Sequence, residues 1–282
     1  MFGSHLPIAG GLHLALLEAE RLNCESLQIF TKNQQQWKCK PLTAEAIGQW
    51  RSHCHRLGFR RTVSHDSYLI NLASPDDRLW NASIDLFIEE LTRCALLGIG
   101  YLVTHPGAHV GSGEDAGLSR VAAGLDRAYG ADGVGEVVTC LEITAGQGSS
   151  LGYKLEHLAE IISRSREPSR FGVCLDTAHL FAAGYDFRGR RYGKFRKELD
   201  ATLGLRRVKV LHLNDSKKDL GSRVDRHEHI GHGKIGKEGF IPFVREEAFL
   251  KIPKILETPK EKHPSGRLWD EVNLETLRAM LK

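Results

Sequence analysis

Histidine and carboxylate side chains stand at the ends of short apolar runs in this chain. Residues 208–211 lead into His212, and residues 171–175 lead into Asp176. Other runs end at His65, His105, Glu142 and Glu257. If the runs are parallel strands, their ends meet in one place, and neutral imidazoles and carboxylates are ligands that a divalent metal binds. The pattern therefore predicts a metalloenzyme.

Three local motifs strengthen this prediction. Asp176 and His179 are spaced i,i+3 at the end of one run, so both can serve one metal or two adjacent metals. Asp225 and His227 are spaced i,i+2 and point the same way if the chain is extended there. His105 and His109 offer two imidazoles on a loop that is rich in turn residues. We expect His5, His109, His229 and His232 to line the site without binding metal.

The charges of these residues suggest the type of substrate. Suppose that four ionised carboxylates and five neutral imidazoles are the ligands; they are Glu142, Asp176, Asp225, Glu257, His65, His105, His179, His212 and His227. Four negative charges then face about six positive charges from three divalent ions. The residual positive charge suits an anion, and metal clusters of this kind hydrolyse phosphodiesters.

The alternation of strand-like and helical segments predicts the fold. Strands are expected to end at residues 5, 31, 65, 105, 142, 176, 212 and 257, including a strand over 26–31. Helices are expected over 13–22, 43–57, 75–97, 115–129, 155–166, 180–183, 195–203 and 239–248. Eight strand–helix units in 282 residues are typical of a TIM (β/α)8 barrel, an α/β fold with its site at the carboxyl ends of the strands. Residues 1–282 are expected to form one catalytic domain.

Composition favours an intracellular enzyme. The formal net charge is +4, which permits a polyanionic partner. We find no apolar stretch near the roughly 18 residues of a membrane helix and no secretion signal. The six cysteines form no C-x-x-C pair, as expected of reduced thiols. A monomer is expected, because no feature of the sequence marks an oligomer surface.

Several motifs together resemble the endonuclease IV family of abasic-site (AP) DNA repair endonucleases. The similarity spans essentially the whole chain, from Gly10-Gly11 to the motif that ends at Pro259. The motifs lie at residues 31–37, 65–71, 105–107, 141–148, 174–186, 212–215, 225–227 and 256–259.

The resemblance implies a TIM barrel with three zinc ions bound by the nine residues above; Mn²⁺ is a possible substitute. His65, His105 and Glu142 would hold the first ion. Glu142, Asp176, His212 and Glu257 would hold the second, with Glu142 bridging, and His179, Asp225 and His227 would hold the third. Glu142 and Glu257 are expected to be catalytic. The family cleaves DNA 5′ to an abasic site, leaving a 3′-hydroxyl and a 5′-deoxyribose phosphate, and also removes 3′-blocking groups.

The resemblance also implies where DNA binds. An abasic nucleotide lacks stacking and pairing, so it is extruded from the duplex at lower cost than an intact one. Tyr68 and Leu69 match the residues that the family inserts into the duplex. The chain departs from the family at Gln35, where members often carry Arg, at Ile143, where Asn is usual, and at His232, where an acidic residue can occur. These departures bear on DNA affinity and not on metal binding.

Two alternatives remain. A sugar isomerase or epimerase of the xylose-isomerase-like barrels would need only Glu142, Asp176, His212 and Glu257, with one or two Mg²⁺ or Mn²⁺ ions. It would have no need of the outer set, His65, His105, His179, Asp225 and His227. A non-catalytic DNA-binding protein is the second alternative, although every ligand position is filled.

Overall fold

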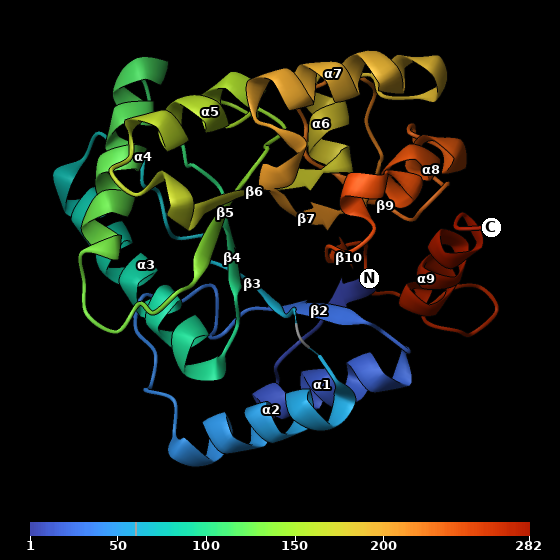
Figure 1. Cartoon of the computed structure of the whole chain (residues 1–282), viewed down its shortest axis with the longest axis horizontal. Helices are drawn as coiled ribbons and strands as arrows, with labels where there is room; N and C mark the ends of the chain where they lie inside the picture. The colour runs from blue at the N-terminus through green and yellow to red at the C-terminus, as the bar shows by residue number, and fades with distance from the viewer. Residues whose placement is uncertain (60) are drawn as a thin grey trace.

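Eight parallel strands form a closed barrel in the computed structural model, which describes residues 1–59 and 61–282 (Figure 1). The order around the barrel is β1-β10-β7-β6-β5-β4-β3-β2, and each neighbouring pair is parallel. The strands are β1 (Phe2–His5), β2 (Ser26–Ile29), β3 (Val63–His65), β4 (Tyr101–Thr104), β5 (Val138–Glu142), β6 (Phe171–Asp176), β7 (Val208–His212) and β10 (Lys254–Leu256). The predicted TIM barrel is confirmed.

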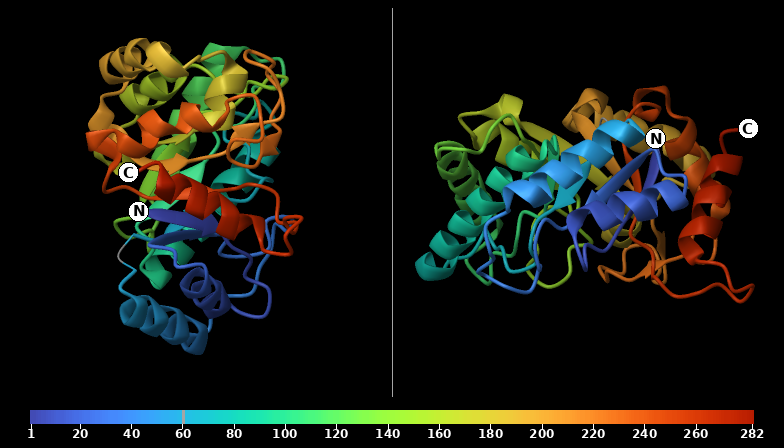
Figure 2. Two further views of the ribbon diagram at one scale, coloured as in Figure 1. Left: turned by 90° about the vertical axis from the view of Figure 1, so that its right-hand side faces the viewer. Right: turned by 90° about the horizontal axis from the view of Figure 1, so that it is seen from below.

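Helices surround the strands and cover their outer face (Figures 1 and 2). They are α1 (Leu12–Arg21), α2 (Ala44–Leu57), α3 (Asp77–Leu97), α4 (Glu114–Tyr129), α5 (Leu155–Arg164), α6 (Thr177–Ala183), α7 (Tyr192–Thr202), α8 (Lys237–Arg245) and α9 (Trp269–Ala279). Buried apolar side chains of strands and helices form a continuous core between the two layers. Among the described helices, none has the length and hydropathy of a membrane-spanning segment.

The barrel interior holds a second, smaller apolar layer, which we call the barrel floor. It consists of Val63, Val103, Cys140, Cys174, Val210 and Ile255, all fully buried. Each of these residues lies two positions before a predicted ligand at the end of the same run. Because side chains alternate between the two faces of a strand, residues i and i+2 point to the same side. The floor therefore lies directly beneath the predicted ligands.

Several boundaries differ from the sequence-based expectation. Strand β2 ends at Ile29 and not at residue 31. Helix α6 begins at Thr177 and not at residue 180, because Oδ1 of Asp176 accepts a 2.9 Å hydrogen bond from the backbone N–H of His179 and caps the helix. Helix α7 begins at Tyr192 and not at residue 195.

Helix α9 and two short strands after β7 were not predicted. Helix α9 follows the last barrel strand and packs beside β1 (Figure 2). A short antiparallel pair, β8 (Asp215–Ser216) and β9 (His227–Glu228), forms within the segment that follows β7. This pair brings residues 225–227 back over the barrel mouth.

Candidate metal centre

The first group of predicted ligands lies at the ends of β3, β4 and β5. His65 and Glu142 are the last residues of β3 and β5, and His105 directly follows β4. Nε2 of His65 and Nε2 of His105 each lie 3.2 Å from Oε2 of Glu142. These three side chains could hold one metal ion.

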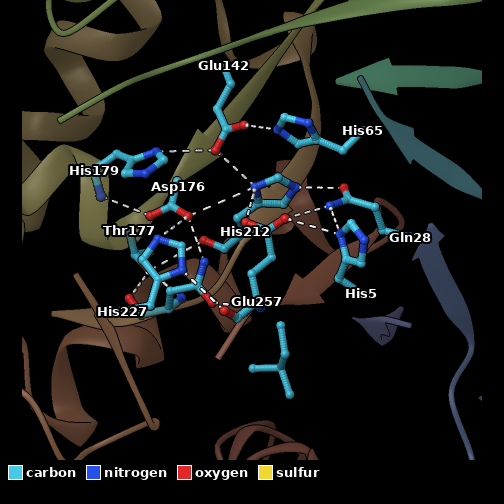
Figure 3. Close-up of polar contacts among 12 residues, drawn as sticks. His5, Gln28, His65, Glu142, Asp176, Thr177, His179, His212, His227 and Glu257 are labelled. Atoms are coloured by element: carbon cyan, nitrogen blue, oxygen red, sulfur yellow. Dashed lines mark hydrogen bonds and ion pairs between the residues drawn. The ribbon is translucent and has the colours of Figure 1, made fainter. Parts of the chain in front are cut away.

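The second group surrounds His212 at the end of β7. Nδ1 of His212 lies 3.0 Å from Oε1 of Glu142, 3.1 Å from Oε2 of Glu257 and 3.9 Å from Oδ2 of Asp176. The four side chains could hold an ion together. Figure 3 shows Glu142 between His65 on one side and His179 and His212 on the other. Its two oxygens therefore face two different groups, as a bridging carboxylate requires.

The third group combines α6 with the β8–β9 segment. Asp225 places Oδ2 3.2 Å from Nε2 of His179 and Oδ1 3.2 Å from Nε2 of His227. Nε2 of His227 also lies 3.7 Å from Oδ2 of Asp176. Ligand atoms of Asp176, His179 and His227 also all lie within 4.8 Å of one another. Asp176 thus lies between the second and third groups.

The imidazole tautomers fit metal binding. Nδ1 of His65, His179 and His227 lies within 3.2 Å of the backbone carbonyls of Asp66, Ile143 and Glu257, respectively. Nε2 of His212 lies 2.8 Å from Oε1 of Gln28. If each of these nitrogens donates its proton there, the other nitrogen carries a lone pair that faces the carboxylates.

The buried Nε2 of His227 also indicates that these residues could bind a metal ion. Nε2 of His227 is buried and makes no well-formed hydrogen bond within residues 1–59 and 61–282, although carboxylate oxygens of Asp225 and Asp176 lie 3.2 Å and 3.7 Å away. An imidazole nitrogen and two carboxylate oxygens that face one another without a hydrogen bond are an arrangement that a cation between them would satisfy. The donor set of imidazole nitrogens and carboxylate oxygens is the one that Zn²⁺ accepts. The residues therefore fit a divalent metal.

Electrostatics keep the carboxylates ionised. Burial raises the pKa of Glu142, but the imidazoles of His212 and His105 outweigh burial and hold this pKa well below its usual range. Burial also lowers the pKa of His65, yet Glu142, Asp66 and Glu257 raise it to about 9. Ionised carboxylates are the form that binds metal.

Several supporting residues were missed by the sequence analysis. Asn214 donates a 2.6 Å hydrogen bond to Oδ2 of Asp176 and accepts one of 2.8 Å from the backbone N–H of Glu257. Gln28 donates a 2.6 Å hydrogen bond to Oε1 of Glu257. Hydroxyl and amide residues such as these are common inside barrels, and only the motif at 212–215 pointed to Asn214.

The other histidines take different positions. Nδ1 of His5 lies 3.5 Å from Oε1 of Glu257, so His5 lines the centre as expected. His109 accepts a hydrogen bond from the backbone N–H of Gly113. His229 stacks on the ring of Trp269, and His232 meets the same ring edge-on.

Of the three residues predicted to contact DNA, Tyr68 lies at the mouth of the centre. Tyr68 is 68% exposed and Gln35 is exposed, whereas Leu69 is half-buried. Tyr68 lines a cavity of about 550 Å³, together with His65, His105, His179 and Asp225. Ile143 is buried, and its backbone carbonyl contacts His179, so this departure from the family leaves the ligand contact intact.

Comparison with known proteins identifies the family. Residues 16–280 match the family model described as xylose isomerase-like TIM barrel. "Probable endonuclease 4" of Chloroflexus aurantiacus is 49% identical over 100% of this chain and 98% of its own length. Endonuclease IV from Thermus thermophilus superimposes with a TM-score of 0.87 at 37% identity, covering 99% of this chain and 98% of that chain.

A sugar-enzyme barrel is also similar in fold. A D-tagatose 3-epimerase-like protein gives a TM-score of 0.74 at 19% identity, covering 99% of this chain and 96% of that chain. A likeness at that identity reflects the shared barrel alone. The identities to endonucleases are much higher and extend over the whole chain, so this chain belongs to the endonuclease IV family of nucleases.

Proposed function

We propose that this protein is a zinc-dependent DNA repair endonuclease that hydrolyses the phosphodiester 5′ to an abasic site. The products are a 3′-hydroxyl and a 5′-deoxyribose phosphate, and the same centre removes blocking groups from 3′ ends. The observation that carries the proposal is the convergence of five imidazoles and four carboxylates at the carboxyl end of the barrel. We further propose that residues 1–282 act as one catalytic domain and as a monomer. We expect the protein inside the cell, in the cytoplasm or associated with DNA.

The proposed ligand sets follow the three groups described above. His65, His105 and Glu142 hold the first ion; Glu142, Asp176, His212 and Glu257 hold the second. His179, Asp225 and His227 hold the third, with Asp176 nearby. Zinc is favoured because the donors are nitrogen and oxygen atoms, and Mn²⁺ is a plausible substitute for the same reason.

When bound, the ions supply Lewis-acid activation of water and neutralise charge that builds up on the phosphate. The residues of the chain set the geometry for this chemistry. Glu257 is ionised, because His212 and His5 lower its pKa more strongly than burial raises it. Its Oε1 accepts from Gln28, which leaves Oε2 directed at the centre. These contacts support our assignment of Glu257 as the group that accepts the proton of the attacking water.

Selectivity for damage follows from the cost of extruding a nucleotide. A nucleotide without a base loses no stacking or pairing when it leaves the duplex. Tyr68 lines the cavity and Leu69 follows it in the chain, so we assign these two side chains to the space left by the missing base. The residual positive charge of the loaded centre attracts the phosphodiester.

The alternative of a sugar isomerase or epimerase is less well supported. Such an enzyme uses only Glu142, Asp176, His212 and Glu257 and has no need of the five outer residues. Here His65, His105, His179, Asp225 and His227 all point their ligand atoms toward the same centre. A non-catalytic DNA-binding protein would not need to retain every one of the nine donors.

The decisive experiment measures cleavage of a labelled duplex with a single abasic site, with and without a metal chelator. We expect incision on the 5′ side, its loss with chelator and its recovery with added Zn²⁺. Extension of the incised strand by a DNA polymerase then reports the 3′-hydroxyl. An intact duplex is the control substrate. If the protein loaded with zinc does not incise the abasic duplex, the proposed function is refuted. A metal content of one ion or none would also refute it.

A further inference from the structure

The segment between β2 and α2 carries Gln35 and is anchored from below by α3. The guanidinium of Arg93 donates a 2.6 Å hydrogen bond to the carbonyl of Thr31 and a 3.1 Å bond to the carbonyl of Lys40. It also donates a 3.1 Å bond to the hydroxyl of Thr31. One side chain therefore joins both ends of the segment 31–40. Arg93 is only 6% exposed.

Two more buried ionisable side chains complete this anchor. Lys32 donates hydrogen bonds to the carbonyls of Gln36 at 2.6 Å and Asn33 at 3.2 Å. Glu90 accepts a 2.8 Å bond from the hydroxyl of Thr31, and its other oxygen lies 4.0 Å from Nζ of Lys32. Lys32 and Glu90 are 4% and 1% exposed. We call Lys32, Glu90 and Arg93 the loop anchor.

Burying the three side chains of the loop anchor costs free energy, so we ask what they provide that apolar side chains could not. Removing charged groups from water costs several kcal/mol per ion unless they are paired and hydrogen-bonded. An apolar cluster could bury the same volume at lower cost, but it could not bind four backbone carbonyls. The anchor binds the carbonyls of Thr31, Asn33, Gln36 and Lys40. The loop anchor therefore fixes the backbone of the segment 31–40.

The same segment is joined to the loop that carries Tyr68 and Leu69. The hydroxyl of Ser67 donates a 2.6 Å hydrogen bond to the carbonyl of Gln34. The ring of Tyr68 meets that of Phe30 edge-on, with centroids 5.5 Å apart. Gln35 and Tyr68 are thus held in one relative position, although they come from different loops.

We propose that Lys32, Glu90 and Arg93 are positioning residues, which hold the segment 31–40 and the Tyr68 loop in their DNA-binding arrangement before DNA arrives. A segment without helix or strand that is ordered in advance loses less conformational entropy on binding. The anchor lies beneath the exposed loop surface, so it acts through the loops and without touching DNA. This inference rests on the proposed function, because it assigns the loops to DNA.

The test compares Arg93→Lys with wild type in two independent measurements. Lysine keeps the charge but lacks the planar fork of arginine, whose two terminal nitrogens bind the carbonyls of Thr31 and Lys40 separately. Amide hydrogen exchange of residues 31–40 should become faster, while exchange in the barrel strands stays unchanged. KM for abasic DNA should rise about tenfold with kcat and zinc content unchanged, because only binding is affected. Arg51→Lys, on the exposed face of α2, is the matched control.

Glu90→Gln is the second variant, in case Arg93→Lys does not fold, and the same changes are expected of it. A folded variant with unchanged exchange and unchanged KM overturns the proposal. A fall in kcat together with loss of zinc also overturns it, because that result assigns the anchor to the metal centre. If wild type does not incise abasic DNA, the proposed function fails, whereas the exchange measurement still decides whether the anchor orders the loop.

Discussion

The side-chain amide of Asn214 donates a 2.6 Å hydrogen bond to Oδ2 of Asp176. Asn214 also accepts a bond from the backbone N–H of Glu257, so it links two proposed ligands on different strands. Partners of this kind orient metal ligands, and their loss typically costs 10- to 100-fold in metal affinity.

We therefore expect Asn214→Ala to weaken zinc binding by about 10- to 100-fold. Competition titration against a chelator measures this change. The control is Asn81→Ala, because Asn81 is exposed on α3 and contacts no proposed ligand: its amide donates to the carbonyl of Asp77 and accepts from Arg127. Equal zinc affinity in Asn214→Ala and wild type would contradict the orienting role.

Glu257→Gln tests the proposed proton acceptor. Glutamine keeps the size of the side chain but cannot accept the proton, so incision should fall by at least about 100-fold. Binding of abasic DNA, measured by fluorescence anisotropy, should stay within a few-fold of wild type. Glu136→Gln, at a fully solvated position, is the matched control. Retention of most incision activity would exclude Glu257 as a catalytic group.

Tyr68→Ala tests the proposed DNA contact. Tyr68 is 68% exposed, so its removal should leave the folded protein almost unchanged. Loss of one aromatic contact to a base typically costs about 1–3 kcal/mol, and we expect Kd for abasic DNA to rise at least about fivefold. Tyr68→Phe should bind almost as wild type, because it retains the ring. An unchanged Kd in Tyr68→Ala would show that the loop does not contact DNA.

Lys254 is the first residue of β10, at the end of the barrel opposite the candidate metal centre, and it makes the free energy of unfolding depend on pH. Burial lowers its pKa from 10.5 to about 8, more than nearby Glu25 raises it. Between these values the unfolded chain binds more protons than the folded chain, so the free energy of unfolding should rise with pH from about 8 to about 10.5. Below pH 8 the folded state bears the full cost of the buried charge.

Lys254→Met removes this charge and should stabilise the protein by up to about 3 kcal/mol at pH 7. The gain should shrink through the window between pH 8 and 10.5. Urea unfolding at several pH values measures it, with the exposed Lys251→Met as control. A difference between Lys254→Met and wild type that does not vary with pH would contradict the assignment of the cost to the charge.

Much of the barrel and of the centre could be predicted from local sequence. An apolar residue followed two positions later by a ligand, as in Val210 and His212 or Cys174 and Asp176, reflects the alternation of side chains along a buried strand. Six strand-end ligands follow from this rule alone. Asp225 and His227 do not, because they depend on the pairing of β8 with β9 across a long loop.

Other features escaped prediction because they depend on contacts between distant residues. Gln28 and Asn214 are polar residues whose partners are known only once the strands are arranged. Helix α9 follows the last strand, where a (β/α)8 barrel has its eighth helix, and it packs beside β1 at the start of the chain. It was not predicted because two helical segments were already assigned between residues 176 and 212. The early start of α6 needed the capping bond of Asp176, which also explains the spacing of Asp176 and His179.

The barrel floor has a consequence for how ions come and go. Val63, Val103, Cys140, Cys174, Val210 and Ile255 pack without solvent exposure beneath the ligands. Small hydrated ions cannot cross such a layer, so they must enter and leave through the mouth where the Tyr68 loop stands. A duplex seated on that mouth covers the exit. We therefore expect a chelator to remove zinc more slowly from the protein bound to abasic DNA than from the free protein.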